Sequence, residues 1–467
     1  MTVRQRIAYK APHRYFGGFL QWLIDTSGVL ANVEQNKEEI VLTIDAKNSN
    51  LAHFNTLLNR FLPHSLFLGE ITTEQTNEPI VTQRFESFDY PIAPCAKCIE
   101  SLSDPSSEHY LDERLVCNHY SNPALINYED CTIFSPHYSP DATLLLTHAA
   151  KVRELFNVTT EEINALFSIE KPTLKVTLAD RTLQEMSGKK FIKIKAPYNN
   201  KSLLASINAK ESGMDYLFFH PTQDREAVVV QKNISLITNP YETLELLDED
   251  RIINRFVAIQ KEAQFQNAIG CYLSTQGVCF LVANEMATKR VITFAPFSMA
   301  KVWERFQSDA KRSTLLANYT QKYPHTIDIL RSSIEDDLFE AVAVLLELNP
   351  ANFEALCDSS YQFRGNGGLK IDTYFDDEGD FDYANFLGSI MSFRLAGAQK
   401  HYLAYSIFEA LGDMAIGICN QLKTKFTIHH FIMMGNLFGN SVLYSRILSK
   451  FQLSNPYFSP AIALDDC

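Results

Sequence analysis

The sequence is poor in the features that mark secreted and membrane-spanning proteins. Its 467 residues hold nine cysteines, an odd number and too few for a disulfide scaffold in a chain of this length. No run of 18 apolar residues exists, although a membrane-spanning helix needs about that many. The first residues, MTVRQRIAYKAPHRYF, have neither the apolar core nor the cleavage site of a signal peptide. We therefore expect a cytoplasmic protein with free thiols and no membrane segment.

Positive charge is also scarce. The chain carries 42 lysines and arginines against 55 aspartates and glutamates, a net charge of −13. Binding to the nucleic-acid backbone needs a basic face, so nucleic acid is not an expected partner. A hydrophobic fraction of 46% is typical of a globular protein, and the length predicts two to four domains.

Hydrophobic periodicity predicts an α/β unit over residues 1–75. Strands are predicted at 6–10, 39–44 and 66–71, with helices at 19–25 and Leu51–Phe61. Pro63 ends the second helix because proline cannot continue one. Strand–helix–strand–helix–strand in so few residues favours a ferredoxin-like sandwich.

The pattern of the rest of the chain predicts further α/β and α+β parts, so we expect a multidomain protein. Residues 75–92 resemble a linker, 93–145 are loop-like, and 150–240 mix helices with short strands. From 242 to 467 the chain is mainly helical, with strands at 268–273, 277–283 and 290–295 and a buried strand in TIHHFIMMG. One amphipathic helix is predicted at 332–348 and another at 400–423. The acidic run DDEGDFD at 376–382 is interpreted as a solvated turn.

The clearest chemical motif is Cys95-x2-Cys98-x18-Cys117 followed by His119. A close cysteine pair and a later ligand match the spacing of zinc sites, which need four nitrogen or sulfur donors in a tetrahedron. A second C-x2-C would place cysteine at position 120, where the chain has tyrosine. The fourth ligand is therefore His119, with Cys131 and His109 as alternatives.

A weaker motif is MMGNLFGN at 433–440, where an apolar strand breaks into a glycine-containing turn before a helix. Turns of this kind hold phosphate groups in α/β folds. The sequence lacks GxSxG, GxGxxG, HExxH and the Walker A pattern, so it identifies no catalytic residue.

Several segments resemble, in order along the chain, the hydrogenase maturation carbamoyltransferase family, HypF. PIAPCAKCIESLSDPSSEHYLDERLVCNHYSNP (91–123) resembles its first zinc-finger segment. RSSIEDDLFEAVAVLLEL (331–348), KHYLAYSIFEALGDMAIGIC (400–419), HHFIMMGNLFGNSVLYSRI (429–447) and PAIAL (460–464) resemble successive segments of its last domain.

The resemblance implies an architecture and an activity. It implies an acylphosphatase-like domain at 1–75, a zinc-finger-like segment at 91–145, a truncated YrdC-like remnant at 150–240 and a Kae/TsaD-like domain of the actin/ASKHA type at 242–467. Family members use ATP and carbamoyl phosphate to make carbamoyl-AMP, and they pass the carbamoyl group to HypE for the cyanide ligands of [NiFe]-hydrogenase. A HypE-like maturation protein or a hydrogenase-related protein is the implied partner.

The nucleotide-binding residues that the resemblance implies are Ser332, Ser333, Gly435, Asn436 and Asn440. The phosphate-handling positions around them depart from the family pattern. Gly17 stands where the acylphosphatase arginine belongs, which leaves Arg14 as the neighbouring cation, and the water-orienting asparagine falls near Gln35 or Asn36. No H-x-x-x-H pair lies near 248–264.

Two further departures concern the last domain. Glu335 and Asp336 replace a glycine and an arginine of the family pattern, and Ser459 replaces its late aspartate. These losses favour a non-catalytic accessory or scaffold protein. The alternatives are an active carbamoyltransferase that uses replacement residues, and a tRNA-modifying relative of the TsaD type, which the acidic charge disfavours.

Overall fold

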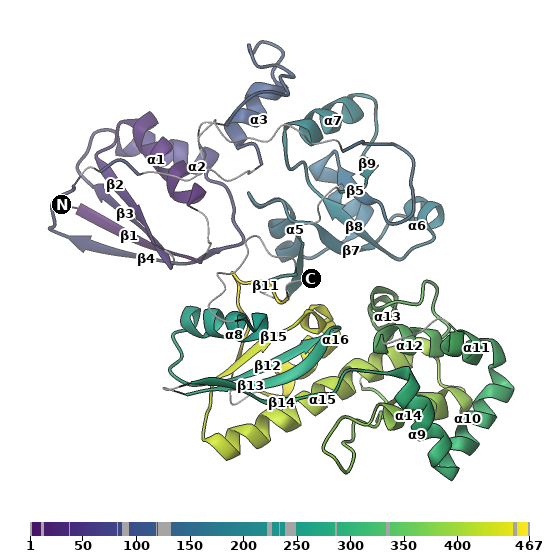
Figure 1. Ribbon diagram of the computed structural model, residues 1–467. Coiled ribbons are helices and arrows are strands. Elements are labelled where there is room, and N and C mark those ends of the chain that lie inside the picture. The colour runs from purple at the N-terminus through teal and green to yellow at the C-terminus, as the bar shows by residue number, and fades with distance from the viewer. Residues whose placement is uncertain are drawn as a thin grey trace. The chain divides into compact units, whose positions relative to one another are not determined.

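The computed structural model divides the chain into two compact units, unit 1 (Met1–Glu242) and unit 2 (Thr243–Cys467) (Figure 1). It describes residues 2–10, 14–36, 38–81, 83–85, 93–117, 119, 132–221, 227–232, 234–238, 249–284, 287–332, 337–365, 367–451 and 455–465.

Unit 1 begins with a four-stranded antiparallel sheet in the order β2-β3-β1-β4. Helices α1 and α2 lie together on one face of this sheet (Figure 1). This order and connectivity are ferredoxin-like, which confirms the predicted fold class. The elements are β1 (Thr2–Tyr9), α1 (Tyr15–Ser27), β2 (Ala31–Gln35), β3 (Glu39–Asp45), α2 (Leu51–Phe61) and β4 (Leu68–Thr76).

A five-stranded mixed sheet follows in unit 1, in the order β6-β7-β8-β5-β9. Strand β5 runs parallel to β8, and the other neighbouring pairs are antiparallel. Helix α3 (Ala96–Ser103) precedes this sheet, and the hairpin β10 (Val228–Gln231) and β11 (Ile234–Ile237) follows it. The sheet and its helices are β5 (Thr143–Leu146), α4 (Val152–Leu155), β6 (Phe156–Asn157), α5 (Thr160–Leu166), β7 (Leu174–Leu178), α6 (Arg181–Ser187), β8 (Phe191–Lys195), α7 (Asn200–Glu211) and β9 (Tyr216–Phe219).

Unit 2 is built on a second five-stranded sheet, in the order β14-β13-β12-β15-β16. Strand β12 pairs antiparallel with β13 and parallel with β15, so the carboxyl ends of β12 and β15 lie at the same edge. Every residue of β12 is buried, as its apolar run predicts. The strands are β12 (Ala268–Ser274), β13 (Gly277–Ala283), β14 (Thr288–Thr293), β15 (Phe431–Met434) and β16 (Pro456–Tyr457).

Helix α15 is the long core helix of unit 2. It contacts β12, α13 (Phe353–Ser360) and α16 (Ser441–Lys450). Among the described residues it is the one helix long and apolar enough to cross a membrane, but 72% of its most apolar window is buried inside the protein, as in a core helix. The other helices are α8 (Arg251–Glu262), α9 (Met299–Ser308), α10 (Ala310–Lys322), α11 (Pro324–Ser332), α12 (Leu338–Leu345) and α14 (Tyr383–Leu395), and α15 itself spans Lys400–Phe426.

The helix predicted at 332–348 is wrong in its start. Ser332 ends α11, and α12 begins at Leu338 with Asp337 as its N-cap. The Asp337 carboxylate accepts hydrogen bonds from the N–H groups of Phe339 and Glu340. These groups have no acceptor within the helix, so the side chain caps the helix start at this point. Residues 333–336 lie outside the described part of the chain.

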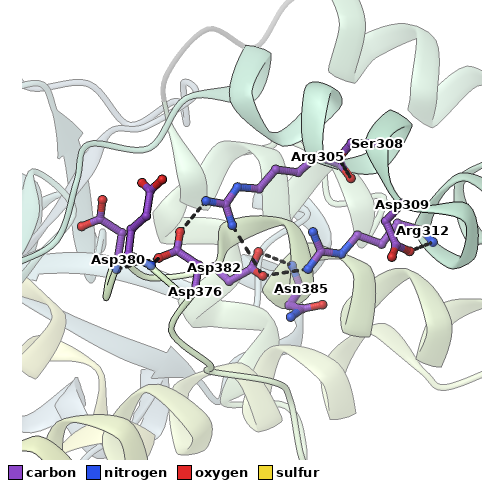
Figure 2. Close-up of polar contacts among 9 residues, drawn as sticks. Arg305, Ser308, Asp309, Arg312, Asp376, Asp380, Asp382 and Asn385 are labelled. Carbon is purple, nitrogen blue, oxygen red and sulfur yellow. Dashed lines mark hydrogen bonds and ion pairs between the residues drawn. The ribbon is translucent and has the colours of Figure 1, made fainter.

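The acidic run at 376–382 is only partly a solvated turn. Asp377 and Glu378 are exposed, but the side chains of Asp376 and Asp382 are only 8% and 5% exposed. Asp376 pairs with Arg305 of α9, and Asp382 Oδ2 lies 2.7 Å from Nη2 of Arg312 of α10 (Figure 2). These ion pairs fasten the loop to two helices, so the sequence interpretation was wrong for these two residues.

Candidate functional site

The structure brings together the four residues predicted to bind a metal. Cys95 caps the N-terminus of α3, where its Sγ accepts a hydrogen bond from the Cys98 N–H at 3.4 Å. Cys117 and His119 approach from the loop that follows. The three Sγ atoms and a histidine nitrogen all lie within 4.8 Å of one another. This Cys3His group can hold a metal ion.

The distances between the ligand atoms fit a tetrahedral ion for two of the three sulfurs. His119 Nδ1 lies 3.8 Å from both Cys98 Sγ and Cys117 Sγ, close to the ~3.6 Å edge expected when Zn–S is ~2.3 Å and Zn–N ~2.0 Å. The 2.8 Å between His119 Nδ1 and Cys95 Sγ is shorter and would have to open on metal binding. Hydrogen bonds with Cys117 and Cys95, together with burial, raise the pKa of the Cys98 thiol. Metal ligation requires this thiol to lose its proton.

Neither alternative fourth ligand, His109 or Cys131, is found in the Cys3His group of the described residues. His109 lies outside the group: its ring nitrogens are 3.6 Å from Glu108 and 3.7 Å from Asp112. Cys131 lies outside the described residues. All seven cysteines in the described part of the chain are free thiols.

Three of the five predicted nucleotide-binding residues lie on the segment that follows β15. Gly435 has φ +103, and a Cβ atom there would come 2.0 Å from the Leu273 carbonyl oxygen, so this position requires glycine. Asn436 joins the ends of β12 and β15: its Oδ1 accepts from Thr275 N at 3.0 Å, and its Nδ2 donates to Thr275 Oγ1 at 2.9 Å.

The side chains of Asn440 and Ser332 make hydrogen bonds at helix ends. Asn440 Oδ1 caps α16 by accepting from the N–H groups of Val442 and Leu443, and its Nδ2 donates to Ser360 Oγ at 3.2 Å. Ser332 Oγ donates to the Asp328 carbonyl oxygen at 2.7 Å at the end of α11. Ser333 lies outside the described residues.

Sequence reasoning missed a buried carboxylate at this edge of the sheet. Asp465 is 4% exposed and accepts hydrogen bonds from Tyr272 Oη at 2.9 Å and Ser274 Oγ at 2.5 Å. The Asn436 N–H donates to it at 3.3 Å. The carboxyl ends of parallel strands are where α/β sheets bind ligands, and here an acidic side chain of the chain itself accepts from these donors. The only signal in the sequence was a pair of aspartates, Asp465 and Asp466, after an apolar segment.

The position aligned with the acylphosphatase arginine is filled by other side chains. A Cβ atom on Gly17 would lie 2.6 Å from the Phe85 ring and 2.7 Å from Gln35 Oε1. Gln35 Oε1 also accepts from the Gly17 N–H at 3.1 Å. Arg14 donates to the Gln35 carbonyl oxygen at 3.2 Å, and its guanidinium carbon lies 4.7 Å from the Phe85 ring centroid. The ends of the Phe85 and Gln35 side chains therefore occupy the space next to position 17, and a longer side chain there would have to displace them.

Three lysines share one face of the second sheet of unit 1, which sequence reasoning also missed. Lys175 of β7 directly faces Lys193 of β8, and Lys195 lies on the same face as Lys193. Lys195 is 6% exposed, with Nζ 4.7 Å from the Tyr198 ring centroid. Like charges opposite each other on neighbouring strands repel, so this face has the charge to receive an anion. The runs LKVTL and FIKIK carried the signal, because lysines alternate there with apolar residues.

Two solved structures define the fold. Over 100% of this chain and 96% of the other, the fold matches a crystal structure of full-length HypF in its phosphate- and nucleotide-bound form, with a TM-score of 0.60 at 12% identity. The HypF of T. kodakarensis matches with a TM-score of 0.57 at 11% identity, over 99% of this chain and 96% of that one. The chain thus has a HypF-like, multidomain α/β fold.

Among curated proteins, the sequence is similar to protein HydE of Wolinella succinogenes. The two are 21% identical over 339 residues, which cover 64% of this chain and 62% of HydE. The match therefore spans less than two thirds of the relative's length. No protein-family model matches the sequence.

Proposed function

We propose that this chain is a HypF-like accessory or scaffold protein of [NiFe]-hydrogenase maturation that has lost carbamoyltransferase activity. The HypF-like fold over the whole chain supports a place in that process. The observation that carries the loss of activity is the environment of Gly17, where Phe85 and Gln35 occupy the space that an anion-binding arginine would need.

The chemistry at Gly17 explains why the change matters. An arginine binds an anionic phosphate through two parallel hydrogen bonds, and a site without it lacks most of the charge that balances a carboxyl phosphate. In unit 2, the hydroxyl groups of Tyr272 and Ser274 donate to Asp465. A second anion at this place would meet the charge of that carboxylate.

The test of lost activity is carbamoyl-phosphate-dependent release of pyrophosphate from ATP by the purified, folded chain. We expect no release above a heat-treated control, while a full-length HypF assayed in parallel releases it. Release by this chain at a comparable rate would contradict the proposal.

The proposed partner is a HypE-like maturation protein or a hydrogenase-related protein in the cytoplasm, and free thiols suit that compartment. We expect a stoichiometric complex when the chain is mixed with the purified partner and analysed by sedimentation velocity. Absence of a complex with both kinds of partner would argue against a scaffold.

An active carbamoyltransferase is the second candidate, and the lysine face of unit 1 favours it. If ATP or carbamoyl phosphate binds there, Lys195→Met abolishes pyrophosphate release. Lys189→Met is the matched control, because Lys189 lies before the start of β8 and its Nζ pairs with exposed Asp141 at 2.9 Å. Equal activity in both variants would argue against this face as the nucleotide site.

We also propose that the Cys3His group binds zinc. Three thiolates and one imidazole are a donor set that Zn2+ takes in structural sites, and the closed set leaves no position for a substrate. The expected result is one equivalent of zinc per chain by plasma mass spectrometry after purification without added metal. A chain that is folded but binds no zinc at micromolar concentration would refute this assignment.

A further inference from the structure

The imidazole of His119 contacts a tryptophan of helix α1 in the ferredoxin-like part, with the two rings tilted relative to each other. The ring centroids of Trp22 and His119 lie 4.2 Å apart with an interplanar angle of 43°. This is at or below the short end of the ~4.5–7 Å range of aromatic pairs, so the two rings are in contact. The contact places a residue of α1 against the imidazole of the Cys3His group.

Trp22 is itself held by aromatic neighbours. Its ring lies 5.4 Å from that of Phe19 in α1 and 5.9 Å from that of Phe61 in α2, the latter in an edge-to-face arrangement. Phe19 is fully buried and Phe61 is 6% exposed. The indole is therefore fixed by both helices of the ferredoxin-like part before it meets His119.

An ion pair between α2 and α3 also links these parts, and it is weaker. Arg60 Nη2 of α2 lies 2.8 Å from Glu100 Oε1 of α3, but the two side chains are 61% and 42% exposed. Exposed ion pairs contribute little, because solvent screens them. The aromatic contact is thus the stronger connection between α1 and α2 and the cysteine-containing segment.

We infer that Trp22 is a positioning residue for the metal centre: it holds the His119 ring with Nδ1 facing the three sulfurs. A ligand that is already oriented loses less conformational freedom when the metal binds, so affinity rises. By linkage, the metal in turn stabilises the packing of α1 and α2, because a coupling between two sites acts in both directions. This inference rests on the metal site proposed above.

The magnitude follows from the kind of contact. An aromatic pair contributes an amount that corresponds to roughly 2- to 12-fold in an equilibrium constant. Removing partners that orient metal ligands costs about 10- to 100-fold in metal affinity. We therefore expect Trp22→Leu, which keeps apolar bulk without an aromatic face, to weaken zinc binding about 10-fold, and Trp22→Phe to weaken it about twofold.

The experiment is a double-mutant cycle on the full chain with Trp22→Leu and His119→Cys. Zinc affinity is measured by competition with a chromogenic chelator, and Co2+ absorption reports whether the bound ion is tetrahedral. In the His119→Cys background the fourth ligand has no ring to stack, so adding Trp22→Leu should change affinity less than twofold. Trp22→Phe and thermal unfolding of each variant control for loss of the fold.

A second readout uses fluorescence. The chain has two tryptophans, and Trp303 lies in unit 2, so Trp303→Phe leaves Trp22 as the sole indole. Zinc loading of that variant should shift the emission of Trp22, whereas in Trp303→Phe/His119→Cys the shift should be absent.

The outcomes separate the two proposals. Wild-type affinity in Trp22→Leu, or an equal loss in both backgrounds, would overturn the role of Trp22 and leave the metal site standing. A folded wild-type chain that binds neither zinc nor cobalt would overturn both.

Discussion

The phenol of Tyr15 donates a hydrogen bond to the Glu170 carboxylate, with 2.6 Å between Tyr15 Oη and Glu170 Oε1. Ser65 Oγ donates to the same oxygen, and the Leu66 N–H donates to Oε2 at 3.0 Å. Burial and the charge of Glu170 raise the pKa of Tyr15 well above its usual value, so the phenol keeps the proton it donates. This buried carboxylate joins the ferredoxin-like part of unit 1 to the part that carries β7.

Removing that carboxylate should destabilise unit 1 strongly. Glu170→Ala leaves three donors without their acceptor in a site where Glu170 is only 6% exposed, so we expect a loss of about 3 kcal/mol. Tyr15→Phe leaves two of the three bonds and should cost about 1–2 kcal/mol. Urea unfolding followed by Trp22 fluorescence in a Trp303→Phe background measures both.

The matched control is Glu161→Ala, an exposed glutamate in the first turn of α5. It should cost about 0.5 kcal/mol through the helix dipole. If Glu170→Ala cost no more than Glu161→Ala, the buried carboxylate would not be a main link within unit 1.

The Asp376 ion pair predicts a pH dependence for unit 2. Burial opposes the charged form of Asp376, but hydrogen bonds from backbone N–H groups, including that of Asp380, and the Arg305 guanidinium outweigh it and hold its pKa below the usual value (Figure 2). A carboxyl group with a lowered pKa contributes stability above its ordinary pKa of ~3.8 and loses it as pH falls through the folded value.

Asp376→Asn tests this contribution. The variant should be less stable than wild type by about 1.5–3 kcal/mol at pH 7, because a charged hydrogen-bond partner is lost, and the difference should shrink as pH falls below the ordinary carboxyl pKa and through the lower folded value. Denaturant titrations between pH 7 and pH 2 provide the measurement. Asp377→Asn, an exposed neighbour, is the control and should behave as wild type. A stability gap that stayed constant with pH would contradict the ion-pair explanation.

Metal binding should depend on His119 and not on His109. His119→Ala removes a ligand, so its zinc affinity should fall by more than the roughly 10- to 100-fold caused by loss of an outer partner. His109→Ala removes an imidazole that is 43% exposed and near only Glu108 and Asp112 among the described ion pairs, and its affinity should be unchanged. Chelator competition on both variants decides between the two histidines, and weaker binding by His109→Ala would reverse the ligand assignment.

Local signals in the sequence were sufficient to predict the bounds of some helices and strands. Helix α2 has its predicted bounds, because its apolar period and Pro63 both act locally. Strand β2 (Ala31–Gln35) was missed, since ANVEQ has little intrinsic preference for a strand and forms one by pairing with β3. The strand predicted in TIHHFIMMG is shorter in the structure: Thr427 takes φ +55 at the end of α15, and β15 begins at Phe431.

The candidate site residues also fall into those that local sequence predicts and those that only the fold brings together. Cys95 and Cys98 lie one helical turn apart and Cys117 follows in the next loop, so the sequence could predict that these sulfurs come together in a group that could hold a metal ion. The contact of Trp22 with His119 joins distant parts of the chain and depends on how α1 and α3 pack. Asp465 meets Tyr272 and Ser274 only because the chain's final segment returns to the end of β12, which no periodicity reveals.

The last prediction concerns Gly435, where the end of β15 meets the end of β12. Gly435→Ala places a methyl group 2.0 Å from the Leu273 carbonyl oxygen at φ +103, so the backbone must shift and unit 2 should lose at least about 2–3 kcal/mol. Gly417→Ala is the matched control: this exposed residue lies within α15, with nothing within 4 Å of an added Cβ. It should gain about 0.5–1 kcal/mol, because alanine favours the helix. Thermal unfolding should therefore move in opposite directions for the two variants, and a Gly435→Ala protein as stable as wild type would show that the two strand ends are not packed this closely.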